Sequence, residues 1–265
     1  IVMPPIALEG PVITIRKFPK DPLTMEKLVA MGAVTPEADR FLKALVEARY
    51  NIFISGGTGA GKTTFLNILS NYIPVSERII TIEDSAELQI RNVENIVRME
   101  ARNANVEGKN QVTIRDLIRS ALRMRPDRII VGEIRDATAI DMLTAMNTGH
   151  DGSLSTGHAN SPKDMLNRLE TLVLMGMDIP LPAIRQQISS AIDIIVHLGR
   201  LRDRSRKVLA ICEIGEVEQG EIQIFPIFSF EEEGEENGRI KGTLKRTSHI
   251  LRSMDKCKKA GVKLE

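Results

Sequence analysis

Short apolar runs alternate along this chain with longer segments in which apolar residues recur every three or four positions. The short runs predict buried strands, and the periodic segments predict amphipathic helices. Strands that alternate with helices of ten or more residues are typical of an α/β protein with a mostly parallel sheet and helices on both faces. The predicted strands are Asn51–Ser55, Arg78–Ile82, Ile96–Met99, Arg128–Val131, Ser153–Thr156 and Ile192–Leu198.

Several helix starts carry an N-terminal signal. Thr35 and Ser161 are each followed by proline, a residue favoured at the first helical position. Thr113 is followed three positions later by Asp116, a variant of the capping box. The predicted helices are Leu23–Met31, Pro36 to about Tyr50, a helix opening near Lys62, Thr113–Met124, Asp136–Met146, Pro162 to near Gly176, and Pro182–Ala191.

The two ends of the chain have a different character. Residues 1–20 alternate around Pro and Gly, and their apolar positions, Val12, Ile13 and Ile15, predict an edge strand. Because these residues are too few to close a core, we interpret 1–20 as the remnant and linker of a truncated N-terminal domain and 21–265 as the main domain.

The C-terminal part predicts strands over Lys207–Val217 and Glu221–Phe230, a turn at Asn237 and Gly238, and a final small helix. This pattern predicts a C-terminal antiparallel β-meander. The acidic run 231–236 is interpreted as a solvated loop.

Composition narrows the possible functions only moderately. A net charge of +1 provides no global field for nucleic acid or an anionic membrane, and an aromatic content of 3% disfavours a base-stacking surface. The two cysteines, Cys212 and Cys257, lie far apart and indicate neither a disulfide framework nor a zinc site, so a reducing cytoplasm is the default expectation. No apolar run approaches the ~18 residues of a membrane span.

A glycine-rich octet, GGTGAGKT at 56–63, lies between the strand ending at Ser55 and the helix opening at Lys62. It fits the phosphate-binding P-loop pattern, whose backbone N–H groups surround a polyphosphate at a helix N-terminus. Lys62 supplies a charge for the β- and γ-phosphates, and the Thr63 hydroxyl can bind Mg²⁺. The glycines at 56, 57, 59 and 61 are expected to allow backbone conformations that a Cβ would forbid. The predicted nucleotide-binding residues are Gly57, Thr58, Gly59, Ala60, Gly61, Lys62, Thr63 and Thr64.

Two glutamates follow predicted strands and are candidates for orienting the attacking water. Glu83 lies in IEDSAEL and Glu133 in IIVGEIRD. Because open α/β sheets bind ligands beyond the carboxyl ends of their strands, both are expected near the P-loop. Gly132 stands where a Walker B aspartate usually holds the metal shell, so Glu133 is expected to contact Mg²⁺ through water or to act as a base. The alternative interpretation of either glutamate, taken alone, is a residue of a surface turn with no catalytic role.

Three further side chains are site candidates. His158 lies in the glycine-rich segment TGHDGSLSTGHANS and is interpreted as a sensor of the γ-phosphate rather than a loop histidine. Arg98 and Arg102 flank a strand end and are candidates for arginine fingers that reach a neighbouring subunit, with solvated charge as the alternative. The basic run 200–207 is interpreted as a solvated turn rather than a nucleic-acid contact.

Four ordered motifs together resemble those of the secretion-superfamily ATPases, which drive type II and type IV secretion and type IV pilus assembly. The motifs are GGTGAGKTT, RIITIEDSAEL, RMRPDRIIVGEIRD and TGHDGSLSTGHANS, similar to the Walker A, Asp box, Walker B and His box. The phrases LRMRPDRIIVGE, DMLTAMNTGHDGS and STGHANSP most resemble the CpaF-like branch that serves Flp (tight-adherence) pili. The resemblance extends from ITIRKF at 13–18 to IFSF at 227–230.

The resemblance implies a RecA-like P-loop ATPase core that binds ATP and Mg²⁺ and works as a homo-oligomer, a hexameric ring. It implies a cytoplasmic motor on the inner face of the membrane that pushes on an inner-membrane platform protein, in pilus assembly or retraction or in secretion. By position, Arg16 would approach the phosphates from the linker, and Arg98 and Arg102 would be arginine fingers. Glu83 and Glu133 would bind water and Mg²⁺, and His158 would sense the γ-phosphate. Nucleotide is expected between the N- and C-terminal domains.

Rival functions remain open from the sequence alone. A nucleic-acid-translocating RecA-like ATPase would need a basic, salt-sensitive surface, which a net charge of +1 does not offer. A non-hydrolysing nucleotide-dependent scaffold is disfavoured by the presence of Lys62, Glu83 and Glu133. A small-molecule kinase is a weaker alternative than these two, because no acceptor pocket or lid is evident in the sequence. No direct nucleic-acid partner is expected.

Overall fold

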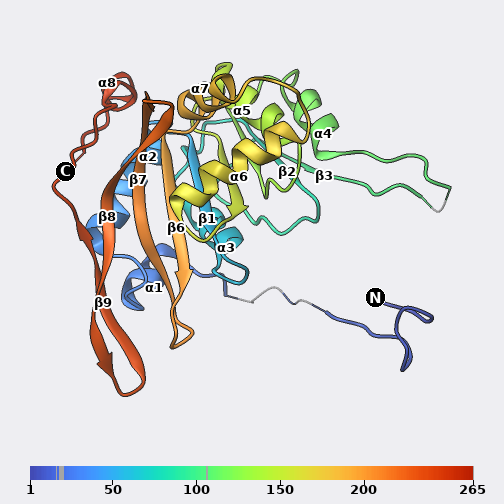
Figure 1. The fold of residues 1–265 in the computed structure, drawn as a ribbon, viewed down its shortest axis with the longest axis horizontal. Helices are drawn as coiled ribbons and strands as arrows, with labels where there is room; N and C mark the ends of the chain where they lie inside the picture. Colours follow the sequence, from blue (N-terminus) through green and yellow to red (C-terminus); the bar gives the residue numbers. More distant parts are fainter. Residues whose placement is uncertain (16, 18–20, 106, 265) are drawn as a thin grey trace.

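One continuous nine-stranded sheet organises the chain, in the order β3-β2-β4-β5-β1-β6-β7-β8-β9 (Figure 1). The computed structural model describes residues 1–265 except 16, 18–20, 106 and 265. The first six strands of this order run parallel, and β7, β8 and β9 continue the sheet antiparallel from β6. The predicted α/β fold with a C-terminal meander is confirmed. The strands are β1 Ile52–Gly56, β2 Ile79–Glu83, β3 Ile96–Glu100, β4 Arg128–Val131, β5 Leu154–His158, β6 Ile194–Arg200, β7 Arg206–Glu218, β8 Glu221–Glu236 and β9 Arg239–Arg246.

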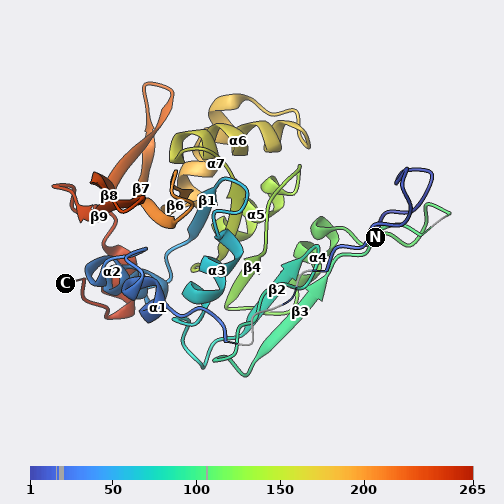
Figure 2. The same cartoon turned by 90° about the horizontal axis from the view of Figure 1, so that it is seen from below.

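Helices cover both faces of the sheet and bury two separate apolar cores (Figure 2). One face packs against α1, α2, α3 and α8, and the other packs against α4, α5, α6 and α7. The central parallel strands are buried along their whole length, which explains why they appear in the sequence as nearly continuous apolar runs. The helices are α1 Met25–Ala30, α2 Pro36–Glu47, α3 Lys62–Ser70, α4 Ile114–Ala121, α5 Ala139–Asn147, α6 Pro162–Leu174, α7 Leu181–Ala191 and α8 Asp255–Ala260.

The predicted helix caps are confirmed. The side chains of Thr35 and Ser161 accept hydrogen bonds from backbone N–H groups three residues later, at the starts of α2 and α6. At α4, Thr113 and Asp116 form a reciprocal capping box. These bonds satisfy N–H groups that the first turn of a helix cannot pair internally.

Several predicted boundaries are wrong for local reasons. α2 ends at Glu47 rather than near Tyr50, because the chain turns at Arg49, which has a φ of 62°. α5 begins at Ala139 rather than Asp136, because the Asp136 carboxylate accepts hydrogen bonds from the backbone and hydroxyl of Thr138 and holds a turn.

Two predictions about irregular segments are also wrong. The run 231–236 is part of β8 and pairs with β9 instead of forming a loop, although its side chains are exposed. Its acids are balanced by bases opposite, as in the Lys245–Glu231 ion pair of 2.8 Å. The N-terminal edge strand is absent among the described residues 1–15, where Val12 forms only an isolated bridge with Val2.

Two segments project from the body of the molecule, as Figures 1 and 2 both show. One is the N-terminal segment, and the other is the connection between β3 and α4. Within the part of the chain that the structure describes, no helix has both the length and the apolar character needed to cross a lipid bilayer.

Candidate active site

The loop between β1 and α3 takes a conformation that depends on glycine. Gly59 and Gly61 have φ values of 73° and 97°, in the left-handed region. Gly56 lies so close to β6 that an added Cβ would be 2.5 Å from the Leu198 carbonyl oxygen. At Gly57 the expectation is wrong, because this residue is outside the left-handed region and a Cβ would meet only open space.

The first turn of α3 points its backbone N–H groups toward this loop. Gly61 is the N-cap and offers no side-chain acceptor, so the helix N-terminus is left for an anion. Ala60, within the loop, is buried, whereas Thr58 and Thr64 are exposed and Thr63 is half-buried. The loop therefore offers backbone amides and threonine hydroxyls beside Lys62.

Lys62 is buried, with 7% of its surface exposed, and its amine meets His158. Nζ lies 3.1 Å from His158 Nδ1 and donates to the Gly57 carbonyl at 3.3 Å. Burial lowers the pKa of Lys62, and the nearby Glu133 carboxylate opposes this shift. Burial and the Lys62 charge both lower the pKa of His158, which favours a neutral ring that can accept a hydrogen bond from Lys62.

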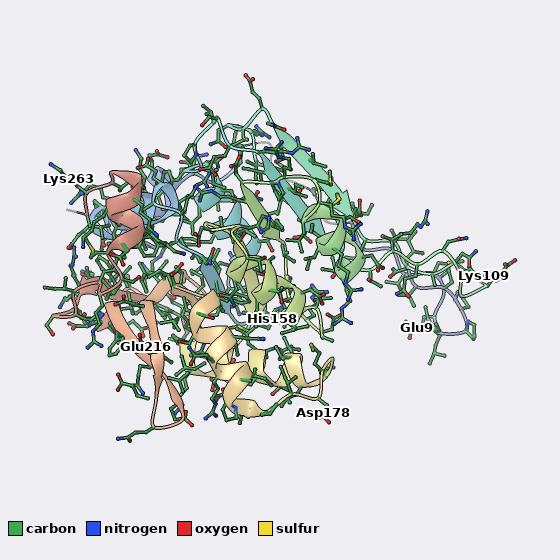
Figure 3. All side chains as sticks on the ribbon, turned by 90° about the horizontal axis from the view of Figure 1, so that it is seen from above. Glu9, Lys109, His158, Asp178, Glu216 and Lys263 are labelled. Atoms are coloured by element: carbon green, nitrogen blue, oxygen red, sulfur yellow. The ribbon has the colours of Figure 1, made fainter. Side chains whose placement is uncertain are left out.

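His158 is the last residue of β5, rather than following the strand as expected. It lies opposite Gly56 in the parallel pairing of β5 with β1, so the strand register itself places the imidazole beside the P-loop. Figure 3 shows His158 in the middle of the molecule, well away from the projecting loop marked by Lys109.

Glu83 ends β2 and is almost fully buried, with 5% exposed. Its Oε2 accepts hydrogen bonds of 2.8 Å from the backbone N–H groups of Glu87 and Leu88. Burial raises its pKa, and these two hydrogen bonds partly oppose the shift. A Cβ at Gly132 would be 3.1 Å from Glu83 Cγ, so glycine at this position leaves room for Glu83.

Glu133 is held over the end of the sheet by contacts between neighbouring strands. The Gly132 N–H donates to the Ile82 carbonyl, and the Ile134 N–H donates to the Thr156 carbonyl, each at 2.9 Å. The Glu133 carboxylate accepts a 2.6 Å hydrogen bond from Arg135 at Oε2, and its Oε1 lies 2.9 Å from His158 Nε2 without hydrogen-bond alignment. Lys62, Glu133 and His158 thus form one connected polar group.

A polar cavity of about 130 Å³ opens between the P-loop helix and the two strand ends. Thr63, Glu83, Asp84 and Glu133 are among its lining residues. Hydroxyl and carboxylate oxygens are the ligands that Mg²⁺ prefers, and Mg²⁺ usually binds through one or two side chains together with substrate phosphates and water. The residues present therefore fit a Mg²⁺-nucleotide.

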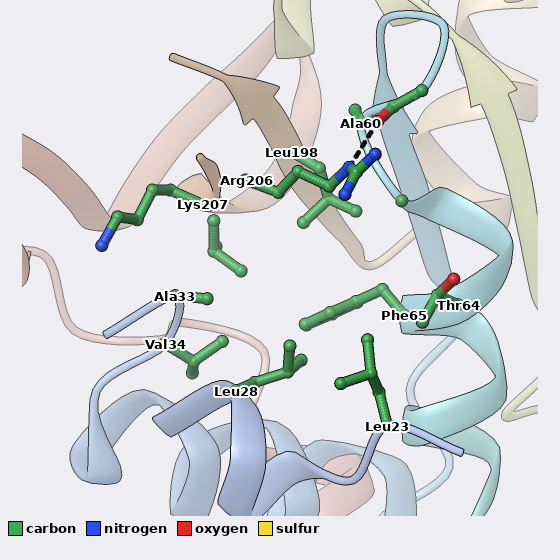
Figure 4. Close-up of a pocket in the computed structure, with 13 residues that line it drawn as sticks. Leu23, Leu28, Ala33, Val34, Ala60, Thr64, Phe65, Leu198, Arg206 and Lys207 are labelled. Carbon is green, nitrogen blue, oxygen red and sulfur yellow. Dashed lines mark hydrogen bonds between the residues drawn. The ribbon is translucent and has the colours of Figure 1, made fainter. Parts of the chain in front are cut away.

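A second cavity of about 310 Å³ adjoins the other side of the P-loop and is mainly apolar (Figure 4). Phe65 and Leu28 project into it, and Arg206 lies along its edge. Arg206 Nε donates to the Gly59 carbonyl at 2.7 Å. The interpretation of 200–207 as a purely solvated turn is therefore wrong at Arg206, which begins β7 and contacts the P-loop.

The predicted fingers lie beside the Glu83 end of the site but far from the P-loop within the chain. Arg98 belongs to the edge strand β3 and donates to the Ile90 carbonyl at 3.0 Å, and Arg102 Nε donates to the Asn110 carbonyl at 2.8 Å. β3 is separated from β1 by β2, β4 and β5, about 19 Å at the usual strand spacing. Arg16 lies outside the described residues.

The site combines residues that the sequence predicted with two that it did not. Glu83, Glu133, Lys62, Thr63 and His158 meet at the carboxyl edge of the parallel strands. Arg135 and Arg206 were not identified. The only sequence signals were the proximity of Arg135 to Glu133 and the basic run that contains Arg206.

A P-loop between a buried strand and a helix, with acids on adjacent strand ends, defines the class of P-loop nucleotide-binding α/β proteins. Within that class the family is shown by direct comparison. The chain matches the family model described as "Type II/IV secretion system protein" over residues 2–261, and it belongs to this family. The predicted membership of the secretion superfamily is thereby confirmed.

Individual relatives agree with this assignment. The Mycobacterium tuberculosis protein Rv3659c is 39% identical over 227 residues, which are 86% of this chain and 64% of that protein. The conjugal transfer protein TrbB of Rhizobium radiobacter is 34% identical over 216 residues, 80% of this chain and 63% of TrbB. The chain thus spans slightly less than two thirds of the length of these relatives.

A solved structure supports the RecA-like fold assignment. The VirB11 ATPase from the Brucella suis type IV secretion system, solved in complex with sulphate, superimposes with a TM-score of 0.59 at 29% identity. The match covers 74% of this chain and 64% of VirB11.

Proposed function

We propose that this chain is the ATP-hydrolysing motor domain of a secretion-superfamily machine, using ATP with Mg²⁺ to move protein subunits in pilus assembly or retraction or in secretion. The observation that carries the proposal is the convergence of Lys62, Glu133 and His158 beside a P-loop whose Thr63 lines a polar cavity. Within the family, the motif phrases favour the CpaF-like branch that serves Flp pili.

The geometry gives each of these residues a role. The P-loop amides and the N-terminus of α3 bind the phosphates, and Lys62 leaves His158 to contact them. When bound, Mg²⁺ would be held by Thr63 and would neutralise charge on the phosphates. Glu133 orients the attacking water, with Glu83 shaping the same cavity.

The apolar cavity beside the P-loop accommodates the nucleobase. It is lined mainly by aliphatic side chains and Phe65, as expected for a cofactor pocket in which polar groups are few. His158, touching both Lys62 and Glu133, responds to whether the γ-phosphate is present.

A ring of copies would use the arginines that this chain does not bring to its own P-loop. Arg98 and Arg102 lie on the opposite side of β2, β4 and β5 from the P-loop, which suits contact with a neighbour's nucleotide. We propose a hexamer, completed by an N-terminal domain of which residues 1–20, Arg16 among them, form the end. The ring works at the cytoplasmic face of the inner membrane against a platform protein.

The test of hydrolysis uses Lys62→Ala and Glu133→Gln. Both variants are expected to keep the circular-dichroism spectrum of the parent and to lose phosphate release by at least about 100-fold, since each removes a group that acts on the transferred phosphoryl or the attacking water. Lys43→Ala, at an exposed position on α2, is the matched control and keeps normal turnover. Near-normal phosphate release from both site variants would overturn the proposal.

Assembly is tested by measuring ATPase activity against protein concentration together with light-scattering mass. Sites completed by a neighbour make turnover per chain rise as the oligomer forms. Arg98→Ala and Arg102→Ala are expected to lower this turnover without lowering nucleotide affinity in the monomer. A flat profile from a monomer with full activity would show that the site is self-contained.

A further inference from the structure

Arg135 contacts the active site but has no role in the chemistry described above. Its Nη2 donates to Glu133 Oε2 at 2.6 Å, and its Nη1 lies 3.8 Å from Asp84 Oδ2. The side chain is 61% exposed, whereas that of Glu133 is only 16% exposed. Because little packing surrounds it, the guanidinium is positioned mainly by these two carboxylates.

The cavity between Thr63 and Glu133 holds an excess of negative charge. Among the described residues that line it, four are carboxylic acids, and Arg135 is the one cation. Unscreened carboxylates this close repel one another, so a counter-charge stabilises the arrangement. The guanidinium is charged at any physiological pH. In the absence of metal, Arg135 provides this counter-charge.

The carboxylate oxygens of this cavity also suit a hard divalent cation, so Arg135 and the metal compete for Glu133. Guanidinium and Mg²⁺ repel each other and cannot both neutralise Glu133 fully. Lys62 does not replace Arg135 in this position, because its amine is directed to His158 and the Gly57 carbonyl.

We propose that Arg135 is a positioning residue that holds Glu133 in an ion pair while the site lacks metal and competes with Mg²⁺-nucleotide for that carboxylate. This inference rests on the proposed function. Loading of the site then requires Arg135 to leave Glu133 for solvent, which its exposure permits. The pair keeps Glu133 in a fixed orientation before loading and weakens metal binding.

The test measures metal affinity directly. Mn²⁺ binding is followed by electron paramagnetic resonance in the presence of a non-hydrolysable ATP analogue, at low salt, for the parent chain and Arg135→Gln. Removing one positive charge near a divalent ion is expected to tighten Mn²⁺ binding about three- to tenfold, and added salt is expected to shrink the difference. Arg135→Lys keeps the charge and is expected to bind Mn²⁺ nearly as the parent does.

Steady-state kinetics provide the second readout. Arg135→Gln is expected to lower the KM for the Mg²⁺-nucleotide with kcat little changed, because Arg135 has already left Glu133 in the loaded site. Arg123→Gln, an exposed arginine just after α4, is the matched control and changes neither value. Because Arg135 is largely exposed, the melting temperature of Arg135→Gln stays within a few degrees of the parent.

Suppose that the parent chain binds Mn²⁺-nucleotide and that Arg135→Gln binds Mn²⁺ no more tightly than the parent. This result would overturn the positioning role of Arg135 and leave the ATPase proposal intact. A parent chain that binds no Mn²⁺-nucleotide would overturn the proposed function, and this inference with it.

Discussion

A buried ion pair at the amino ends of the central strands offers the sharpest test of how this sheet is held together. Arg128, the first residue of β4, is fully buried and forms two hydrogen bonds with Glu77, at 2.5 and 2.9 Å. Its Nη1 donates to the Val46 carbonyl at 2.7 Å and to the Gly152 carbonyl at 3.4 Å. A Cβ at Gly152 would lie 2.7 Å from the guanidinium, so glycine there leaves room for it. Arg128 thus joins β4 to the end of α2 and to the segments before β2 and β5.

We predict that Arg128→Met destabilises the chain by about 3–5 kcal/mol, because it leaves the Glu77 carboxylate buried with one weaker partner. That partner is Arg49, whose Nε lies 3.3 Å from Glu77 and whose side chain is 40% exposed. For a chain of this size the loss corresponds to a fall in melting temperature of about 6–20 °C. Urea unfolding followed by circular dichroism measures the change, with Arg119→Met on the exposed face of α4 as control.

A double variant separates pairing from packing. Arg128→Met with Glu77→Leu removes both charges together, and buried pairs replaced by apolar residues of similar volume often cost little. The double variant is therefore expected to recover most of the stability that either single variant loses. A cost below about 1 kcal/mol for Arg128→Met alone, or a double variant that is simply additive, would refute the account of Arg128 as a buried charge dependent on Glu77.

Three further predictions concern residues nearer the site. Gly132→Ala places a Cβ 3.1 Å from Glu83 Cγ and is expected to lower kcat about tenfold with little change in melting temperature. Arg206→Gln removes the 2.7 Å hydrogen bond to the Gly59 carbonyl and is expected to raise the KM for ATP several-fold with kcat little changed. Burial lowers the pKa of His197, so the unfolded chain binds more protons below pH ~6.5 and stability falls as pH falls there. His197→Gln is expected to flatten this slope in thermal melts between pH 5 and 7.

Each of these has an outcome that contradicts it. Parent-like kcat for Gly132→Ala would show that Glu83 adjusts freely. An equal change in KM for Arg204→Gln, an exposed neighbour in the same turn, would show a general charge effect rather than support of the P-loop. The same pH slope in parent and His197→Gln would assign the slope to other groups.

The parallel half of the fold could be predicted because its determinants are local. Strands β1, β2 and β4 are buried on both faces, so each appears as an uninterrupted apolar run. Hydrogen bonds between side chain and backbone three residues apart fix the starts of α2, α4 and α6. The extension of β8 through the acidic run 231–236 could not be predicted this way, because it depends on bases in β9 across the hairpin.

The residues of the site also separate into those with a local sequence signal and those without one. Lys62 and Thr63 follow from the P-loop pattern, and Glu83, Glu133 and His158 follow from their places at or just beyond strand ends, since parallel strands deliver their carboxyl ends to one edge. Arg206 contacts the P-loop from a position more than a hundred residues later, and its neighbours in sequence give no sign of the Gly59 contact. Such contacts arise from the sheet order, in which β6 and β7 follow β1, rather than from any local pattern.

Gly132 shows how a correct motif can be given an incomplete physical reason. In the sequence it marks the absence of a metal-binding aspartate before Glu133. In the structure its missing Cβ is what lets Glu83 pack against the end of β4, where two backbone N–H groups hold the Glu83 carboxylate. An aspartate at this position would therefore add a carboxylate, but its Cβ would displace the Glu83 side chain. Gly132 therefore affects the positions of both glutamates, because its backbone carries Glu133 and its missing Cβ leaves the space beside Glu83.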